Sequence, residues 1–419
     1  MDQTLTYYSE RIVDYVKKYA SQMLCESDGH YLAHPFIVPG SKFYATDLWD
    51  WDSWMTDIAL RQYASIDKDF AELLPKYELG CLMNFADYTT EEGFMPISIT
   101  TLKGAAFDRP EGDHWPNMHK PVYAQHAAFL ATQGMELPQE VLDAAVRFLT
   151  AYETHFKHEK SGLFFWQDDC AIGVDNDPCT YFRPEKSSAS ILLNSFLYRE
   201  MLALGTLYEQ KGDMNNGMLW KKKAGQLAKA VSKHCFDERD GCFYSADLNL
   251  LPNENIVGLH QGAPRDWESL IMRIDVWSNI LHLWAGIATA EQAECVIKRF
   301  RETRTYRANY GIRSLSAKEK MYDLSATNNP SNWRGPIWGV ANYFCWRAML
   351  KYGFTEDAAW LAESTIRLFG QDLEKTGTLH EYYHPDTGEA IITPNFINWN
   401  ALVLNMISWL KGEPCCFEF

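Results

Sequence analysis

Hydrophobic residues recur every three or four positions along most of the chain, which is the spacing of amphipathic helices. In the first segment this spacing places Ile12, Val13 and Val16 on one face. The same spacing predicts further helices over residues 57–74, 121–134, 137–156, 187–211, 216–235, 266–285, 289–302, 336–352, 355–371 and 397–411. Strand-like runs are few and short, at 162–166, 241–244 and 388–393. The chain is therefore predicted to be almost entirely helical.

Long irregular segments separate many of these helices and are rich in Gly, Pro, Trp, Tyr or Asp. They cover residues 26–50, 92–120, 158–186, 303–335 and 376–396. About ten to twelve helices joined alternately by short and long connections fit a ring of helical hairpins. We therefore predict one all-α domain over residues 1–419, an (α/α)6 barrel with long catalytic loops on one rim. A helical-repeat solenoid is the competing architecture, but no fixed sequence period supports it.

The charge balance narrows the possible partners. The 419 residues include 39 Lys and Arg against 55 Asp and Glu, a formal net charge of −16. Nucleic acids and anionic membranes need clustered basic residues, and the sequence has no such run. The chain also contains 15 Trp, 22 Tyr and 22 Phe, more indole than a core needs. Surplus aromatic faces suit the flat apolar faces of sugar rings, so we expect a small carbohydrate as the partner.

Compartment and cofactors are predicted from what the sequence lacks. The ten cysteines include no CxxC pair, and no His/Cys cluster has zinc spacing, so they are interpreted as free thiols in a reducing compartment. The first residues do not resemble a signal peptide, and no window approaches about 18 consecutive apolar residues. We therefore expect a cytoplasmic protein without metal, cofactor or membrane contact. The sequence carries no indication of an oligomer.

The densest candidate site lies between residues 44 and 54. Three indoles and three carboxylates occur within eight residues, namely Asp47, Trp49, Asp50, Trp51, Asp52 and Trp54. Unpaired buried carboxylates cost several kcal/mol, so a core does not favour this alternation. A sugar pocket does favour it, because indoles stack on the ring and carboxylates accept hydrogen bonds from hydroxyls. The competing interpretation is a capped helix start with Trp49 and Trp54 packed inward.

Three further segments carry candidate chemistry. Asp175 follows Gly173 in a loop after an aromatic run that ends at Trp166, although this pattern alone is typical of an ordinary turn. Trp333-Arg334-Gly-Pro-Ile-Trp338 precedes a predicted helix. Glu381 stands among aromatic residues, whereas Asp386 and Glu389 belong to a Pro-Asp-Thr-Gly turn and are predicted to be solvated. His380 and His384 lie four residues apart, but no third ligand completes a metal site.

Taken in this order, the segments resemble the inverting α-glycosidases of glycoside hydrolase family 63, and more distantly the family 37 trehalases. The segment from Pro39 to Ser53 looks like the trehalase-type Pro-Gly-Gly-Arg-Phe…Trp-Asp-Ser motif, and 333–338 looks like Trp-Arg-Gly-Pro-x-Trp. Lys120-Pro121…Gln125 resembles the Lys-Pro…Gln helix start of that family, and residues 311–316 resemble one of its loops in sequence and in order along the chain. The compact length is most similar to the mannosylglycerate and glucosylglycerate hydrolases of that group.

The resemblance implies roles for individual residues. Asp175 stands where the family has its general acid and Glu381 where it has its general base. The residues that would bind the terminal sugar are Tyr44, Trp49, Trp51, Asp52, Gln125, Trp166, Gly173, Trp333, Arg334 and Trp338. Two positions depart from the family pattern, because Cys170–Ile172 replace a tryptophan-containing stretch and Asn332 replaces an aromatic residue. The neighbouring pair Asp168-Asp169 offers an alternative acid.

The leading functional hypothesis is an inverting, exo-acting α-glycoside hydrolase, an α-glucosidase on small α-glucosides or short oligosaccharides. A mannosylglycerate or glucosylglycerate hydrolase is the nearest alternative, and its anionic substrate would need a cation such as Arg183, Arg265 or Arg313. A sugar 2-epimerase on the same barrel would instead use histidine pairs drawn from His114, His119, His126, His380 and His384. A carbohydrate-binding barrel without catalysis would require Asp175 or Glu381 to be misplaced.

Overall fold

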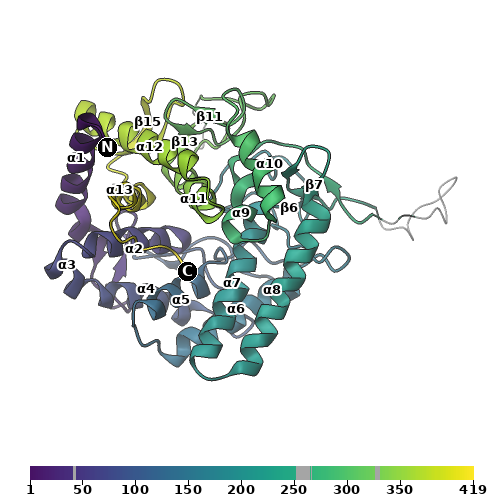
Figure 1. The fold of residues 1–419 in the computed structure, drawn as a ribbon. Coiled ribbons are helices and arrows are strands. Elements are labelled where there is room, and N and C mark those ends of the chain that lie inside the picture. Colours follow the sequence, from purple (N-terminus) through teal and green to yellow (C-terminus); the bar gives the residue numbers. More distant parts are fainter. Residues whose placement is uncertain (41–43, 252–264, 266, 326–330) are drawn as a thin grey trace.

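The computed structural model of the chain describes residues 1–40, 44–251, 265, 267–325 and 331–419. Its helices alternate along the chain between an outer and an inner ring, which is the (α/α)6 barrel that the sequence predicts (Figure 1). Within the described residues the outer ring consists of α1 (Gln3–Tyr19), α4 (Pro75–Tyr88), α6 (Gln139–His155), α8 (Met214–Cys235), α10 (Ala290–Phe300) and α12 (Thr355–Thr376). The inner ring consists of α2 (Asp50–Ala64), α5 (Tyr123–Thr132), α7 (Ile191–Gln210), α9 (Leu281–Ala285), α11 (Gly339–Lys351) and α13 (Val403–Lys411).

The two rings differ in how much of each helix is buried. In α1 the buried residues include Leu5, Ile12 and Val16 at helical spacing, while the opposite face is exposed. In α2 every residue except Arg61 is buried. An amphipathic helix covers a core, and a helix that is buried all round lies inside it. Each fully buried aliphatic side chain contributes about 1.5–3 kcal/mol, so most of the stability comes from the contacts between the rings.

Local signals at the helix ends agree with the fold. Asp2 accepts a hydrogen bond from the backbone nitrogen of Leu5 at 2.7 Å and caps α1. Thr289 and Gln292 form a reciprocal capping box at α10. Gly377 ends α12 in the left-handed conformation, where a glycine carries no Cβ penalty.

Short strands and turns fill the connections between the helices. The strands are β1 (Leu24–Cys25), β2 (Phe36–Ile37), β3 (Asp47–Trp49), β4 (Ser98–Thr100), β5 (Gly104–Ala105), β6 (Ser188–Ala189), β7 (Phe236–Asp237), β8 (Cys242–Phe243), β9 (Ala246–Asp247), β10 (Leu270–Ile271), β11 (Arg307–Ala308), β12 (Gly311–Ile312), β13 (Ile337–Trp338), β14 (His380–Tyr383) and β15 (Ala390–Pro394). Three short helical pieces, η1 (Ala20–Met23), η4 (Trp277–Ile280) and η5 (Asn398–Leu402), and the short α3 (Lys68–Leu73) complete the described elements. Two small sheets, β3-β4-β5 and β13-β14-β15, are antiparallel and carry residues of the candidate site.

Three expectations about elements were wrong. The predicted helix 57–74 is two helices, since α2 begins at Asp50 and ends at Ala64, and α3 follows. The helix α4, which opens with Pro75 in its first turn, was not predicted. Over 266–285, whose first residue lies outside the described residues, the chain forms β10, then η4, and is α-helical only in α9. Apolar runs that are buried on all sides lack the period that separates helix from strand.

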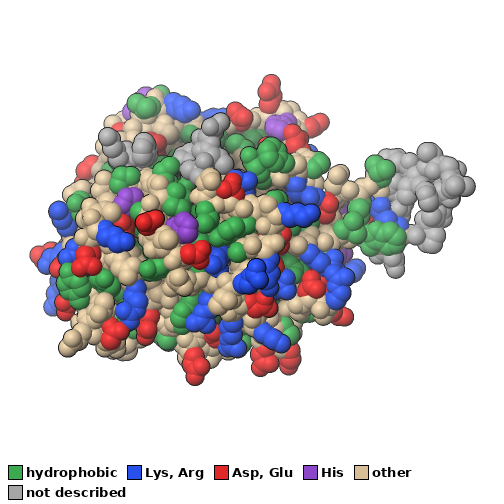
Figure 2. All heavy atoms as spheres, turned by 90° about the horizontal axis from the view of Figure 1, so that it is seen from above, with side chains coloured by type: hydrophobic (Ala, Val, Ile, Leu, Met, Phe, Trp, Pro, Cys, Tyr) green, Lys and Arg blue, Asp and Glu red, His purple; other side chains and the backbone are tan. Residues whose placement is uncertain are grey.

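Two surface properties complete the description. None of the described helices combines the length and the apolar character that a membrane span requires. On the face displayed in Figure 2, acidic and basic side chains are intermixed.

Candidate active site

A cavity of about 410 Å³ lies at the rim where several inner helices begin. Asp52 enters it from the first turn of α2, and Trp338 enters it from the residue that precedes α11. Its described lining residues are Tyr44, Trp49, Trp51, Asp52, Ile97, Phe107, Lys120, Asp169, Cys170, Ala171, Gly173, Asp175, Asn176, Tyr181, Ser331, Trp338, Glu381, Phe396 and Trp399. Indoles and carboxylates, which are separated by up to 350 positions in the sequence, therefore meet in one hollow.

Asp175 reaches the cavity on the loop between α6 and β6. Gly173 precedes it with φ +88°, and a Cβ atom there would lie 2.5 Å from Lys120 Cε and 2.8 Å from Trp51 Cζ2. Only glycine lets the loop pass this close to both side chains. On the other side, Asn176 accepts a hydrogen bond from the backbone nitrogen of Trp333 at 2.9 Å. The loop is thus fixed on both sides of Asp175.

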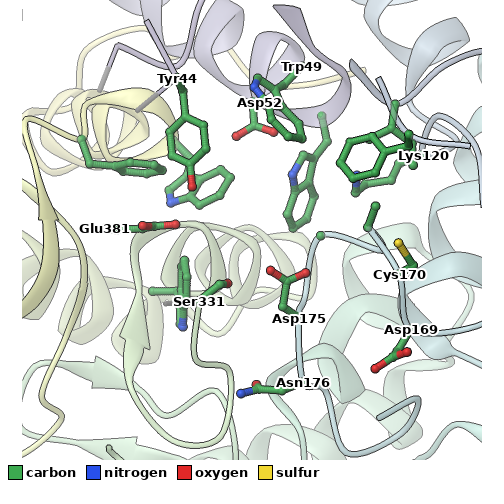
Figure 3. Close-up of a pocket in the computed structure, with 18 of the residues that line it drawn as sticks. Tyr44, Trp49, Asp52, Lys120, Asp169, Cys170, Asp175, Asn176, Ser331 and Glu381 are labelled. Carbon is green, nitrogen blue, oxygen red and sulfur yellow. The ribbon is translucent and has the colours of Figure 1, made fainter. Parts of the chain in front are cut away.

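Glu381 comes from β14, the middle strand of the sheet β13-β14-β15. Figure 3 shows its carboxylate and that of Asp175 on opposite sides of the cavity, with Tyr44 and Asp52 above them. Burial raises the pKa of Glu381 to about 7. The Thr393 hydroxyl beside the carboxylate opposes the rise, and the negative charge of Asp175 adds to it. The two carboxylates therefore interact across the cavity.

Asp52 is the third carboxylate of the cavity. Asn398 Nδ2 donates to Asp52 Oδ1 at 2.5 Å, and Thr56 Oγ1 donates to Asn398 Oδ1 at 3.0 Å. Burial and, after it, the charge of Asp50 raise the pKa of Asp52 to about 7. Asn398 is the donor that the described residues supply to Asp52, so the carboxylate can still accept hydrogen bonds from sugar hydroxyls.

Asp50 has a different task from Asp52. Its carboxylate oxygens lie 3.0 and 2.9 Å from Lys120 Nζ, and one of them also accepts from the Lys120 backbone nitrogen at 2.9 Å. Both side chains are buried. Lys120 Nζ lies 5.4 Å from the ring centre of Trp51, so the ion pair also supports a wall of the cavity. The expectation that carboxylates of this motif bind sugar hydroxyls is therefore not met by Asp50, which balances a buried cation.

Strained backbone is concentrated around the cavity. Non-glycine residues with φ between +26° and +68° occur at Phe107, Ala171, Asn176, Phe182, Lys186, Thr393, Asn395 and Asn398 among the described positions. Phe107, Ala171 and Asn176 line the cavity, Thr393 lies beside Glu381, and Asn398 donates a hydrogen bond to Asp52. Such conformations cost of order 1–3 kcal/mol each and persist where the surroundings hold a functional geometry.

Residues 45–399 match the family described as the mannosylglycerate hydrolase MGH1-like glycoside hydrolase domain. The chain belongs to this family. The resemblance predicted from the motifs is thereby confirmed.

Relatives with other names share parts of this domain. A cytosolic neutral trehalase of Beauveria bassiana is 22% identical over 78% of the chain and 49% of its own length, so the chain spans about half of that relative. A mannosyl-oligosaccharide glucosidase of Saccharomyces cerevisiae is 31% identical over 24% of the chain and 13% of its own length. The crystal structure of a family 63 mannosylglycerate hydrolase from Thermus thermophilus, in complex with glucose, aligns with a TM-score of 0.64, 19% identity, and 94% and 98% coverage of the two chains. This structure shows that the fold is shared.

In this MGH1-like domain, the cavity brings together most of the predicted sugar-binding residues. Tyr44, Trp49, Trp51, Asp52, Gly173 and Trp338 line it together with Asp175 and Glu381. Ser41, Lys42 and Phe43, which belong to the same motif as Tyr44, lie outside the described residues.

Four predicted sugar-binding residues lie behind the wall of the cavity. Trp333 stacks on Trp338 with ring centres 4.0 Å apart, so it backs a lining residue. Arg334 pairs with Asp323 at 2.9 Å. Gln125 is fully buried and donates to the Pro121 and Phe196 carbonyls. Trp166 is buried as well. These four positions support the cavity and do not line it.

Several lining residues were missed in the sequence. Phe107 and Tyr181 lie in loops without a recognisable pattern, and Phe107 meets Trp49 edge-on at 5.9 Å. Phe396 and Trp399 stand at the start of the last predicted helix, and an aromatic cluster just before a helix is the signal that points to them. Asn176 follows Asp175 in a stretch whose sequence is typical of an ordinary turn, and both ends of its side-chain amide form hydrogen bonds.

Asp169 of the alternative acid pair lines the cavity, whereas the histidines lie elsewhere. Figure 3 places Asp169 on the far side of Asp175 from Glu381, and Asp168 accepts from Asn117 at 3.0 Å. No histidine is found among the described residues that line the cavity. His126 is buried beside Asp57 at 2.8 Å, and His380 lies 2.9 Å from Asp372. The described residues also include no group of three or more His, Cys, Asp and Glu arranged to hold a metal ion.

Proposed function

We propose that the protein is an inverting α-glycoside hydrolase that removes a terminal sugar, an α-glucosidase on small, uncharged α-glucosides. The observation that carries the proposal is the placement of Asp175 and Glu381 on opposite sides of an indole-walled cavity of about 410 Å³. The volume suits a terminal sugar with part of its aglycone. In this proposal the whole chain acts as one domain, and its ten free cysteines suit a reducing compartment such as the cytoplasm.

Each of the two carboxyl groups has one role. Asp175 carries the proton and gives it to the glycosidic oxygen as the bond to the anomeric carbon breaks. Glu381, ionised, removes a proton from a water molecule that attacks the anomeric carbon from the opposite face of the ring. The oxygen that enters and the oxygen that leaves are on opposite faces, so the configuration inverts. Repulsion between the two groups favours the singly protonated pair that this reaction needs.

The remaining lining residues bind the sugar. Asp52 accepts hydroxyl hydrogen bonds while Asn398 fixes its orientation. Trp49, Trp51 and Trp338 offer aromatic faces to the apolar faces of the ring. Trp333 and Arg334 act from behind the wall, through the stacked indole of Trp338 and through Asp323.

The charge of the cavity favours an uncharged substrate over a glycosylglycerate. Four carboxylates, those of Asp52, Asp169, Asp175 and Glu381, line it, and the cation among its described lining residues is Lys120. Asp50 already neutralises Lys120. An anionic aglycone about 8 Å from one carboxylate would be repelled by about 2 kcal/mol at an effective dielectric constant of 20.

The arginines that the sequence offers to bind an anionic aglycone form ion pairs with other residues. Arg183 lies 2.7 Å from Asp247, Arg265 lies 3.5 Å from Glu268, and Arg313 lies 2.9 Å from Asp386. None of the three lines the cavity. The name mannosylglycerate hydrolase therefore describes the family, and for this chain we favour a neutral glycoside.

A screen of α-linked disaccharides and glycosylglycerates with product identification tests the proposal. We expect release of glucose from a neutral α-glucoside, and NMR of the first product should show the β-anomer. Asp175→Asn and Glu381→Gln should each reduce turnover by about a thousandfold or more while glucose binding, followed by calorimetry, is kept. An α-anomer as the first product would contradict inversion, and near-normal turnover in either variant would remove that residue from its role.

A further inference from the structure

A second cavity, of about 470 Å³, lies at the other end of the barrel from the candidate active site. The helix α11 connects the two ends, because Trp338, just before its start, lines the first cavity and its last residues line the second. Thirteen helical residues span about 20 Å. The lining residues of this base cavity are Arg199, Trp284, Arg347, Leu350, Lys351, Thr355, Trp409, Phe417 and Glu418. In Figure 1 the C-terminus, which supplies two of them, lies near the middle of the ring.

The base cavity already holds one internal carboxylate. Glu418 accepts hydrogen bonds from Tyr343 Oη at 2.6 Å, from Trp284 Nε1 at 2.8 Å and from Arg347 Nε at 3.0 Å. Burial opposes its ionisation, but Arg347, the charge of Arg199 and the Tyr343 hydrogen bond together outweigh burial and hold the pKa of Glu418 below its usual value. This end of the barrel is therefore built to hold an anion.

One carboxylate does not balance the cations around it. Arg199, Arg347 and Lys351 line the base cavity against Glu418, which leaves a local charge of about +2 in a protein of net charge −16. Lys351 Nζ donates to the carbonyl of Trp284 at 3.2 Å. Lys351 both lines the cavity and is an exposed residue, so it lies at the mouth of the cavity. Burial and, after it, the charge of Arg199 lower the pKa of Lys351 to about 8. The two cations are therefore close enough to repel one another.

Arg199 is the less satisfied of these two cations. The charge of Glu418 acts on its guanidinium, but its buried Nε has no hydrogen-bond partner within the described part of the chain. Its charge lies 4.9 Å from the ring centre of Trp284 and 5.6 Å from that of Phe419. A buried N–H group without an acceptor costs free energy, and such a group points to a bound water or ion. The aromatic contacts fix the guanidinium in place.

We propose that the base cavity is a binding site for a phosphate-type oxyanion, held between Arg199 and Lys351. A guanidinium offers a planar fork of N–H donors, and an ammonium offers a point charge, and both are suited to the oxygens of a phosphate. The volume accepts either inorganic phosphate or the phosphate group of a small phosphorylated metabolite. Glu418 leaves room for one further anion, because its hydrogen bonds to a guanidinium go to Arg347, and a single carboxylate does not balance three cations.

Calorimetry and thermal unfolding of the full chain in sodium phosphate, against sodium chloride at equal ionic strength, test the proposal. Phosphate should raise Tm in a saturable manner, and Arg199→Met should weaken its binding about tenfold or more. Glu418→Gln should act in the opposite direction and strengthen binding, because it removes the competing negative charge. Glycerol 3-phosphate with glycerol as its control separates the two sources of phosphate, since a phosphorylated metabolite should bind more tightly than the free ion.

Two further variants keep the test decisive. Lys222→Met removes an exposed cation of α8 and should leave phosphate binding unchanged, which excludes an effect of net charge alone. If Arg199→Met fails to fold, Lys351→Met at the exposed mouth should still weaken phosphate binding. Equal Tm in phosphate and chloride, or binding that is unchanged in Arg199→Met or Lys351→Met, would overturn the proposal.

Discussion

The hydroxyl of Thr393 is predicted to set the pH at which the candidate base becomes active. The pKa of Glu381 rises from 4.5 to about 7, with burial as the largest cause. Thr393 opposes the rise more strongly than Asp175 adds to it. Thr393→Val removes the hydroxyl at almost constant volume and should raise the pKa of Glu381 by about one unit, or 1.36 kcal/mol.

The expected consequence is a loss of activity that disappears at high pH. A base must be ionised, so a higher pKa moves the rising limb of the kcat/KM profile to higher pH. If the pKa of Glu381 is about 7 in the unchanged protein and about 8 in Thr393→Val, the ionised fraction of Glu381 falls roughly fivefold at pH 7. At pH 9 it falls by only about a tenth. The profile is measured with 4-nitrophenyl α-glucoside, and Thr150→Val on the exposed face of α6 serves as the matched control.

Asp175→Asn provides a reference within the same assay. In the proposed mechanism Asp175 carries its proton while Glu381 ionises, so this variant removes no charge at that stage and should leave the rising limb in place. The 4-nitrophenyl leaving group needs little help from an acid, so the remaining activity of this variant reports on the base. A rising limb that stays in place in Thr393→Val would refute the assignment of this limb to Glu381.

Two further substitutions test how the cavity is supported. Gly173→Ala should lower kcat/KM at least about tenfold, because its Cβ would meet Lys120 and Trp51. Gly353→Ala is the matched control, since Gly353 also has a positive φ (+78°) but a Cβ there would have no atom within 4 Å. This control should lose only about 1 kcal/mol of stability in thermal unfolding and keep its activity. Equal activity in both variants would contradict the close approach. Lys120→Met should reduce the free energy of unfolding in urea by about 3–5 kcal/mol because it leaves Asp50 buried without a partner, and adding Asp50→Asn should restore part of that loss. If the losses of unfolding free energy in Lys120→Met and Asp50→Asn simply add in the double variant, Lys120 and Asp50 are not coupled.

The fold could be predicted largely because the outer ring is amphipathic. Helices such as α1, α8 and α10 alternate buried and exposed residues, so their period is visible in the sequence. The inner helix α2 is buried on almost all sides and carries Trp-Asp-Trp-Asp at its start, so its first turn was taken for a loop. The run 270–285 is also apolar throughout, and its sequence alone does not separate an extended strand from a helix.

The candidate site was predicted less completely, because sequence motifs do not show which side of a wall a residue occupies. Trp333 and Trp338 belong to one motif, yet Trp338 lines the cavity and Trp333 stacks behind it. Gln125 could equally have faced the cavity, but its amide satisfies two backbone carbonyls between α5 and α7. Conversely, Phe107 reaches the cavity from a loop whose sequence has no motif.

Three buried asparagines explain how strained loops can hold the candidate catalytic groups in place. Asn176 bonds Asn332 through its amide nitrogen at 3.2 Å and Trp333 through its oxygen at 2.9 Å. Asn398 donates to Asp52, accepts from Thr56, and its backbone nitrogen donates to the Pro39 carbonyl at 2.9 Å. Asn176 and Asn398 have positive φ, which asparagine tolerates better than most residues.

A side-chain amide both donates and accepts, so one asparagine can join two segments that are far apart in the sequence. Asn176 and Asn332 are 156 positions apart, and Asn398 and Asp52 are 346 positions apart. Each hydrogen bond contributes only about 1 kcal/mol, but its loss would leave a buried partner unsatisfied at a further cost of about 1–3 kcal/mol. Asn176 and Asn332 together therefore fix the loop that carries Asp175.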